Sequence, residues 1–439
     1  MIAPEEFKQR RKQLMRRMKK NGIAILSSAP AAVRNRDVEY PYRQSSDFDY
    51  LTGFDEPDAI VVLIPGRKEG EYVLFCREFD VSLAIWTGKH AGLEGAVDTH
   101  GADEAHPIYE FPEKLPFLLE NRDRVYYPVG ENEDLDQQVR QAVNAVRAKS
   151  RGGVRAPTEF IVVDKLVHEM RLFKSKTELN VMRRAAEVSA QAHCRAMRFC
   201  KPGLREYEVE AEFVHESTRH GMRSQAYPAI VAGGNNACVL HYTTNDDILR
   251  DGDLLLIDAG AECNNYAADI TRTFPISGKF SEPQKLLYEL VLEAQLAAIR
   301  AVKPGKRWIE PHEAAVKVLT KGLVELGLLK GKVNKLIKDE AYKPFFMHRT
   351  GHWLGMDVHD VGDYRDEDGE WRKLEPGMVL TVEPGLYVAA DCDSVDPKWR
   401  GIGIRIEDDV VVTEDGCEIL TSGVPKSVAD IEALMGQPA

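Results

Sequence analysis

The chain has 439 residues, 44% of them hydrophobic and 29% charged, which is more than one ordinary core holds and predicts two domains. Its formal net charge of −12 offers no basic field to nucleic acid or anionic lipid, so we expect neither as a partner. The seven cysteines are odd in number and form no CxxC pair, which favours a reducing compartment and a cytoplasmic protein.

The first part of the chain alternates helical and strand-like patterns. Pro4 begins an amphipathic helix that ends at Asn21-Gly22, and no apolar secretory segment follows it. Apolar runs too short to cross a bilayer then alternate with helical patterns. The runs are Ile23–Leu26, Ala59–Ile64 and Tyr72–Phe75, and the helical patterns are Pro112–Glu120 and Leu135–Lys149. This alternation predicts a smaller α/β domain.

A break at Lys174-Ser175 separates this domain from the remainder. Ser175 and Glu178 form a capping box for a long helix that reaches about Arg198. We therefore expect one domain over residues 1–173 and a second over residues 174–439. In the second domain, helices at about 207–220, 282–302, 310–326 and 428–435 separate strand-rich segments at 229–231, 254–258, 268–275, 378–383 and 402–412. Helices set apart from a mostly antiparallel sheet predict an α+β domain.

Five side chains that bind metals well occur in the second domain, most of them at the edges of apolar strand-like runs. They are Asp258, Asp269, His352, Glu383 and Glu407. A carboxylate taken into an apolar sheet is costly unless it is paired, hydrogen-bonded or bound to a cation. Four carboxylates and one imidazole suit two hard or borderline divalent ions that share ligands and activate water. The set therefore predicts a dinuclear metallohydrolase.

Local patterns support this prediction but leave alternatives open. Asn264-Asn265 is a turn signal that would fold Asp258 and Asp269 toward one site. The alternative is that Asp258 caps a strand end and Asp269 pairs with Arg272.

The patterns around the histidines and around the last carboxylate also permit more than one interpretation. His348 and His352, at spacing i, i+4, share a face in either a helix or a strand. Arg405 and Glu407, at spacing i, i+2 on a strand, also share a face, and a simple ion pair is the alternative. The HExxH motif is absent, which excludes a helix-borne single-zinc protease.

Taken in order, these motifs resemble the creatinase/aminopeptidase-fold ("pita-bread") metallopeptidases over about residues 173–420. The motifs are His241-Tyr242, Asp258, Asp269, His348-x-x-Gly351-His352, His359-Asp360, Val382-Glu383-Pro384-Gly385 and Arg405-Ile406-Glu407. The segments 40–48 and 50–54 resemble the N-terminal domain of the aminopeptidase P branch. The resemblance implies a pita-bread catalytic domain, with an antiparallel sheet and flanking helices, after a smaller creatinase-like α/β domain.

The resemblance also implies an activity and a metal centre. It implies a dinuclear metal-dependent aminopeptidase that hydrolyses the N-terminal Xaa-Pro bond of peptides through a metal-bridging hydroxide. Two divalent ions, with Mn²⁺ favoured by the carboxylates, would be held as follows. Asp258 would bind one ion, Asp269 and Glu407 would bridge both, and His352 and Glu383 would complete the shell of the other.

The remaining site residues follow from the same resemblance. Glu383 would steer a proton to the leaving nitrogen, His348 and His359 would donate to the oxyanion, and His241 would shape the proline side of the pocket. The expected substrate-binding residues are Trp86, Tyr387, Arg405 and Arg151. For Trp86, ordinary core packing is the alternative.

Three other functions compete with this reading. Prolidase shares the ligands but accepts only Xaa-Pro dipeptides, and a methionine aminopeptidase would leave the long N-terminal domain unexplained. A non-catalytic peptide-binding protein with this fold would lack ligands, whereas all five are present. Arg349-Thr350 departs from the smaller or apolar residues of relatives, which bears on substrate preference alone. We expect a homodimer or homotetramer, in which the Trp86 segment reaches a neighbouring site.

Overall fold

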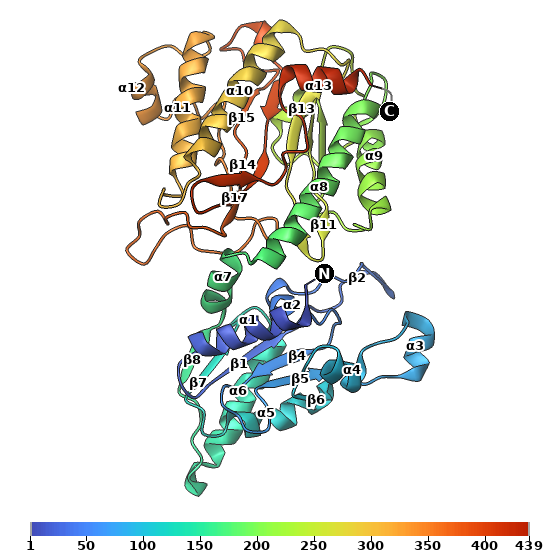
Figure 1. Cartoon of the computed structure of the whole chain (residues 1–439), viewed down its shortest axis with the longest axis vertical. Helices are drawn as coiled ribbons and strands as arrows, with labels where there is room; N and C mark the ends of the chain where they lie inside the picture. Colours follow the sequence, from blue (N-terminus) through green and yellow to red (C-terminus); the bar gives the residue numbers. More distant parts are fainter. Residues whose placement is uncertain (1, 438–439) are drawn as a thin grey trace. The chain divides into compact units, whose positions relative to one another are not determined.

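The computed structural model describes residues 2–437 and mixes helices with β-sheets (Figure 1). The chain divides into two units, the first ending at Arg171 and the second beginning at Leu172. Within residues 2–437, every helix is too short or too polar to span a membrane. All seven cysteines lie in this range and are free thiols.

The first unit is built on a six-stranded mixed sheet with the order β6-β5-β4-β1-β7-β8. Its strands are β1 (Gly22–Ser27), β4 (Ile60–Leu63), β5 (Tyr72–Cys76), β6 (Glu104–Pro107), β7 (Arg124–Tyr127) and β8 (Glu159–Val162), beside a small hairpin of β2 (Val33–Asn35) and β3 (Val38–Glu39). Its helices are α1 (Pro4–Arg17), α2 (Ser46–Thr52), α3 (Val81–Thr87), α4 (Gly92–Asp98), α5 (Phe111–Leu119), α6 (Glu133–Ala148) and α7 (Asp164–Leu172). The buried residues of α5 and α6 recur at helical spacing and therefore lie on one face of each helix. These faces pack on the apolar side chains of the sheet.

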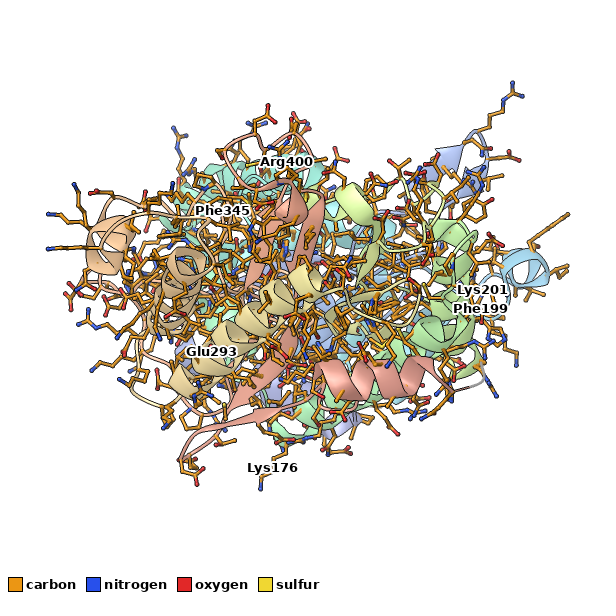
Figure 2. All side chains as sticks on the ribbon, turned by 90° about the horizontal axis from the view of Figure 1, so that it is seen from above. Lys176, Phe199, Lys201, Glu293, Phe345 and Arg400 are labelled. Carbon is orange, nitrogen blue, oxygen red and sulfur yellow. The ribbon has the colours of Figure 1, made fainter. Side chains whose placement is uncertain are left out.

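The second unit contains two helix pairs. The predicted capping box is present, since Ser175 and Glu178 cap α8 (Lys176–Phe199) reciprocally. Figure 2 labels both ends of this helix, Lys176 and Phe199. α8 packs against α9 (Glu206–Arg219), and α10 (Glu282–Ala301) packs against α11 (Glu310–Glu325). The remaining helices are α12 (Val333–Lys338) and α13 (Val428–Met435).

Short antiparallel sheets fill the space between these helices, as the sequence predicted. One sheet joins β13 (Thr271–Pro275), β10 (Leu254–Asp258) and β9 (Ile230–Gly233), and another joins β14 (Val379–Val382), β17 (Asp408–Val412) and β18 (Cys417–Ile419). Two-stranded pairs are β11 (Glu262–Cys263) with β12 (Tyr266–Ala267), and β15 (Gly385–Val388) with β16 (Ile402–Arg405). All of these pairings are antiparallel.

Two local predictions have different outcomes. The hairpin at Asn264-Asn265 is confirmed, because both residues have positive φ values of 46° and 63°, as a tight hairpin turn requires. The strand-rich segment predicted over residues 402–412 consists of two strands, β16 and β17, because the chain changes partners at Ile406 and Glu407. There, Ile406 N–H donates to Pro384 O and Glu407 N–H to Thr271 O, so β16 and β17 join different sheets.

Candidate metal centre and active site

An antiparallel strand pair brings the first two carboxylates together. Asp258 ends β10 opposite Thr271, the first residue of β13, and Asp269 precedes β13 by two residues. The hydroxyl of Tyr227 lies 2.6 Å from Asp258 Oδ1 and 2.5 Å from Asp269 Oδ1. The alternative pairing of Asp269 with Arg272 is wrong, because Arg272 Nη2 donates instead to Asp408 Oδ1 at 2.7 Å.

His352 is placed beside Glu383 by backbone hydrogen bonds between its own segment and β14. Thr381 N–H donates to His352 O at 3.0 Å, and Glu383 N–H donates to Thr350 O at 2.8 Å. Gly351 permits this approach, because a Cβ at that position would lie 2.1 Å from Thr381 O. His352 Nε2 consequently lies 3.9 Å from Glu383 Oε1.

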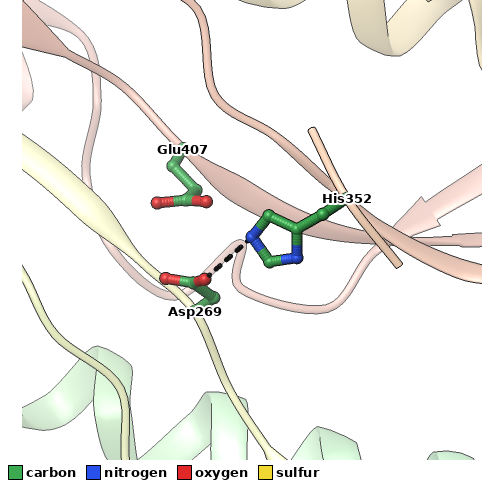
Figure 3. A group of neighbouring side chains, drawn as sticks. All are labelled: Asp269, His352 and Glu407. Carbon is green, nitrogen blue, oxygen red and sulfur yellow. Dashed lines mark ion pairs between the residues drawn. The ribbon is translucent and has the colours of Figure 1, made fainter. Parts of the chain in front are cut away.

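Glu407 enters the same region from the bend between β16 and β17. Its Oε2 accepts a hydrogen bond from Thr271 Oγ1 at 2.6 Å. Asp269, His352 and Glu407 each offer a ligand atom, and these atoms lie within 4.8 Å of one another (Figure 3). The dashed line in Figure 3 joins His352 Nε2 to Asp269 Oδ2, which are 3.3 Å apart.

A cavity of about 600 Å³ contains this group. Its lining comes from segments far apart in the sequence. The lining residues are Tyr227, Pro228, Ile230, Leu240, His241, Thr243, Asp258, Asp269, His348, Arg349, Gly351, His352, Val358, His359, Tyr364, Glu383, Arg405 and Glu407. The structure therefore gathers all five expected ligands in one cavity with the three expected histidines and Arg405.

The buried carboxylates perturb one another strongly. Burial, together with Asp269 and Asp258, raises the pKa of Glu383 to about 7. Burial and the same neighbours raise the pKa of Glu407 well above its ordinary value. Burial opposes the charged form of His352, but its hydrogen bond to Asp269 and the charge of that residue outweigh burial and raise the pKa to about 9. Such a set of oxygen donors with one imidazole fits divalent cations, whose charge would offset the repulsion.

The three histidines differ in what they contact. His348 Nδ1 lies 2.7 Å from Arg349 O, and its Nε2 lies 2.8 Å from Tyr387 Oη. Because a carbonyl only accepts, Nδ1 must donate, and Nε2 accepts from the tyrosine hydroxyl. Burial lowers the pKa of His348 to about 3, so the ring is neutral. The ring of His359 meets that of His352 edge-on, with 4.4 Å between centroids. His241 is exposed at the cavity.

Arg405 and Tyr387 form a buried hydrogen-bonded pair next to the metal-binding group. Arg405 Nη1 donates to Tyr387 Oη at 3.1 Å, and its Nη2 donates to Asp258 Oδ2 at 2.5 Å. Arg405 lines the cavity, whereas Tyr387 is outside the lining residues and supports His348 and Arg405 from behind. Gly385 leaves room for this pair, because a Cβ there would lie 2.5 Å from Tyr387 Oη.

Two expected substrate-binding residues belong to the first unit and do not line the cavity. Trp86 lies on α3, and its side chain is 86% exposed. Core packing is therefore wrong for Trp86 in the single chain. Arg151 lies in a short 3₁₀ helix (Ser150–Gly152) and is also exposed.

Sequence reasoning missed two residues that contact the expected ligands. Tyr227 touches Asp258 and Asp269, and Thr271 touches Glu407. The Tyr227 hydroxyl thus bridges the two aspartates, and burial raises the pKa of Asp269. Thr271 lies two residues after Asp269 on the same strand edge, and this proximity was the available signal.

Comparison with known proteins shows what the whole chain is similar to. Residues 180–414 match metallopeptidase family M24, and residues 7–126 match the N-terminal domain of aminopeptidase P. The chain is 48% identical to the Xaa-Pro aminopeptidase of Escherichia coli (strain K12) over 435 residues, which cover 99% of this chain and 98% of that protein.

Solved structures give the same result. The structure of Pseudomonas aeruginosa aminopeptidase PepP aligns with a TM-score of 0.97 and 59% identity, over 99% of this chain and 98% of that one. Zinc-substituted Escherichia coli aminopeptidase P in complex with product aligns with a TM-score of 0.95 and 48% identity, with the same coverage. The predicted fold, a pita-bread domain that follows a smaller N-terminal domain in the sequence, is confirmed.

Proposed function

The chain belongs to metallopeptidase family M24, and from that premise we propose that it is an Xaa-Pro aminopeptidase, a hydrolase that removes the residue preceding a proline from the N-terminus of peptides. One observation carries the proposal: a single cavity unites five metal-binding side chains, three histidines and Arg405. Similarity to Xaa-Pro aminopeptidases along nearly the full length supports it. We place the boundary between the two functional domains at residues 173 and 174, where α7 gives way to α8.

The donor set fits two divalent ions, for which its four carboxylates favour Mn²⁺. We assign Asp258 to one ion, Asp269 and Glu407 to both, and His352 and Glu383 to the other. When bound, these ions would polarise the scissile carbonyl and lower the pKa of a bridging water, so that hydroxide forms near neutral pH.

Side chains of the protein then transfer the proton and stabilise the negative charge that develops on the substrate. Glu383 accepts a proton on its carboxylate and delivers it to the departing proline nitrogen. His359 donates an N–H to the carbonyl oxygen as negative charge develops there. The oxyanion role expected of His348 is not part of this proposal, because both of its ring nitrogens are engaged inside the protein. His348 instead fixes the hydroxyl of Tyr387. His241 borders the space that receives the proline ring.

Recognition of proline rests on ring shape, because an acylated proline nitrogen has no N–H to offer. Apolar lining residues such as Ile230, Leu240 and Val358 supply a surface for the ring. We assign the peptide beyond the proline to Arg405 and, more remotely, to Arg151 and Trp86.

The proposal also covers the oligomeric state and the cellular compartment of the enzyme. It assembles as a homodimer or homotetramer, and Trp86 of one subunit reaches the site of a neighbour. It works in the cytoplasm, which agrees with its seven free cysteines, all within the described residues.

Kinetics on Ala-Pro, Ala-Pro-Ala and Ala-Ala-Ala, with added Mn²⁺ or Zn²⁺, test the proposal. Contacts beyond the ring use remote binding energy to align the scissile bond, so the dipeptide should lose turnover as well as affinity. Ala-Ala-Ala should also be poor, because it leaves a pocket shaped for proline partly empty. If Ala-Pro is the best of the three substrates, prolidase replaces the aminopeptidase. A purified protein that binds no divalent metal would instead favour a peptide-binding function.

A further inference from the structure

Glu206, the first residue of α9, is a fully buried carboxylate that lies outside the cavity lining, with 0% of its surface exposed. Its Oε1 accepts from Gly233 N at 2.7 Å and from Asn236 Nδ2 at 3.0 Å. Its Oε2 accepts from Tyr242 Oη at 2.7 Å and from Asp247 N at 3.0 Å. These four donors supply the hydrogen bonds that an unhydrated carboxylate needs.

The four donors all belong to one stretch of chain, the segment 233–247 that leaves β9 and returns toward β10. In its middle lies His241, directly before Tyr242. Leu240, His241 and Thr243 line the catalytic cavity. Glu206 therefore fixes both ends of the segment and the residue next to its histidine, although Glu206 itself does not line the cavity.

A second carboxylate, one helical turn further along α9, holds the same segment. Glu210 Oε2 accepts from Asn245 Nδ2 at 3.0 Å. Asn245 is buried and has a left-handed backbone (φ 50°), and it also bonds Ala229 O and Val231 N. The segment is thus tied to α9 at several points on each side of His241, which is itself exposed.

We propose that Glu206 is a positioning residue for His241, through which α9 sets the proline side of the substrate pocket. This inference rests on the proposed function, because it needs His241 to contact substrate. The Glu206→Gln change keeps one acceptor oxygen and puts an NH₂ group against one pair of donors, so the clamp loosens at one side. A misplaced contact residue typically costs up to about a hundredfold in rate.

A double-mutant cycle on the manganese-loaded enzyme separates positioning from general stability. Glu206→Gln should lower kcat/KM for Ala-Pro-Ala by about ten- to a hundredfold, yet by less than about twofold when His241 is already alanine. Tyr242→Phe removes one of the four donors beside His241 and should show the same coupling to a smaller degree, and it carries the test if Glu206→Gln does not fold. Equal losses in both backgrounds, or no loss in either, would overturn the proposal.

Two further measurements keep this result distinct from the fate of the proposed function. Glu212→Gln makes the same chemical change on the same helix, where the carboxylate bonds Arg195 instead, and it should leave kcat/KM unchanged. Amide hydrogen exchange, which needs no turnover, should quicken across 237–247 in Glu206→Gln and stay constant in β10. Unchanged exchange in 237–247 of the variant would contradict the role of Glu206. A parent enzyme that does not cleave Xaa-Pro peptides would contradict the proposed function and leave the exchange result as it stands.

Discussion

Removing divalent cations should make the stability of the second unit fall as the pH rises from 6.5 to 9. In the metal-free protein, burial disfavours the charged form of His352, but Asp269 outweighs it and raises the pKa to about 9 from 6.5. Between these two values the folded state keeps a proton that the unfolded chain has released. Stability from this group is therefore complete below pH 6.5 and is lost as the pH approaches 9.

The size of the effect follows from linkage. Each pH unit over which the two states differ by one proton changes the free energy of unfolding by about 1.4 kcal/mol. A rise in the pKa of His352 from 6.5 to about 9 thus corresponds to about 3 kcal/mol lost. Glu383 acts in the same direction at lower pH, because its pKa rises from 4.5 to about 7 on burial. For a unit of this size, about 3 kcal/mol lowers Tm by roughly 6–12 °C.

Calorimetry on EDTA-treated and Mn²⁺-reloaded protein at pH 6.5 and pH 9 measures this effect. The reloaded protein should show a much smaller difference, because the cation replaces the proton as the partner of the carboxylates. Metal-free His352→Gln should lose most of the pH dependence, since glutamine does not titrate. An equal Tm at both pH values in the metal-free parent, or an undiminished drop in His352→Gln, would refute the reasoning.

Three further changes test other parts of the site. His359→Ala should keep its metal content by elemental analysis but lose about a hundred- to a thousandfold in kcat, the usual cost of one oxyanion donor; near-normal turnover contradicts the role. Tyr227→Phe should weaken metal affinity about ten- to a hundredfold in a chelator competition, and unchanged affinity would show that its hydroxyl does not orient the aspartates. Lys174→Met should cost about 3–5 kcal/mol in urea unfolding, because Lys174 Nζ lies 2.8 Å from Asp360 Oδ2 and both side chains are 1% exposed. The exposed Lys176→Met control should change stability by less than about 0.5 kcal/mol, and equal effects of the two changes would contradict the buried pairing.

Much of the metal-binding group was predictable because its chemistry coincides with local patterns. Asp258 ends an apolar run, and Asn264-Asn265 has the residues that a tight turn demands. The turn folds Asp269 back beside Asp258 within a dozen residues. A local signal was therefore enough to predict a shared site.

Features that depend on distant partners were not predictable in the same way. Alternation over 402–412 indicates strand but does not reveal that the two halves pair with different strands, so the bend at Glu407 was missed. Tyr227 lies 31 and 42 positions from the aspartates that it touches, and no local pattern marks that contact. The exposure of Trp86 depends on how helix α3 packs, which an apolar run alone does not define.

The order of the ligands along the chain has a consequence for biosynthesis. Thr271 and its partner Glu407 are 136 positions apart, so the hairpin bearing Asp258 and Asp269 leaves the ribosome long before Glu407. At about 5–20 residues per second, this gap lasts roughly 7–27 s. During that time the two aspartates lack Glu407 as a neighbour. The candidate metal-binding group of Asp269, His352 and Glu407 is therefore complete only after most of the second unit has been synthesised.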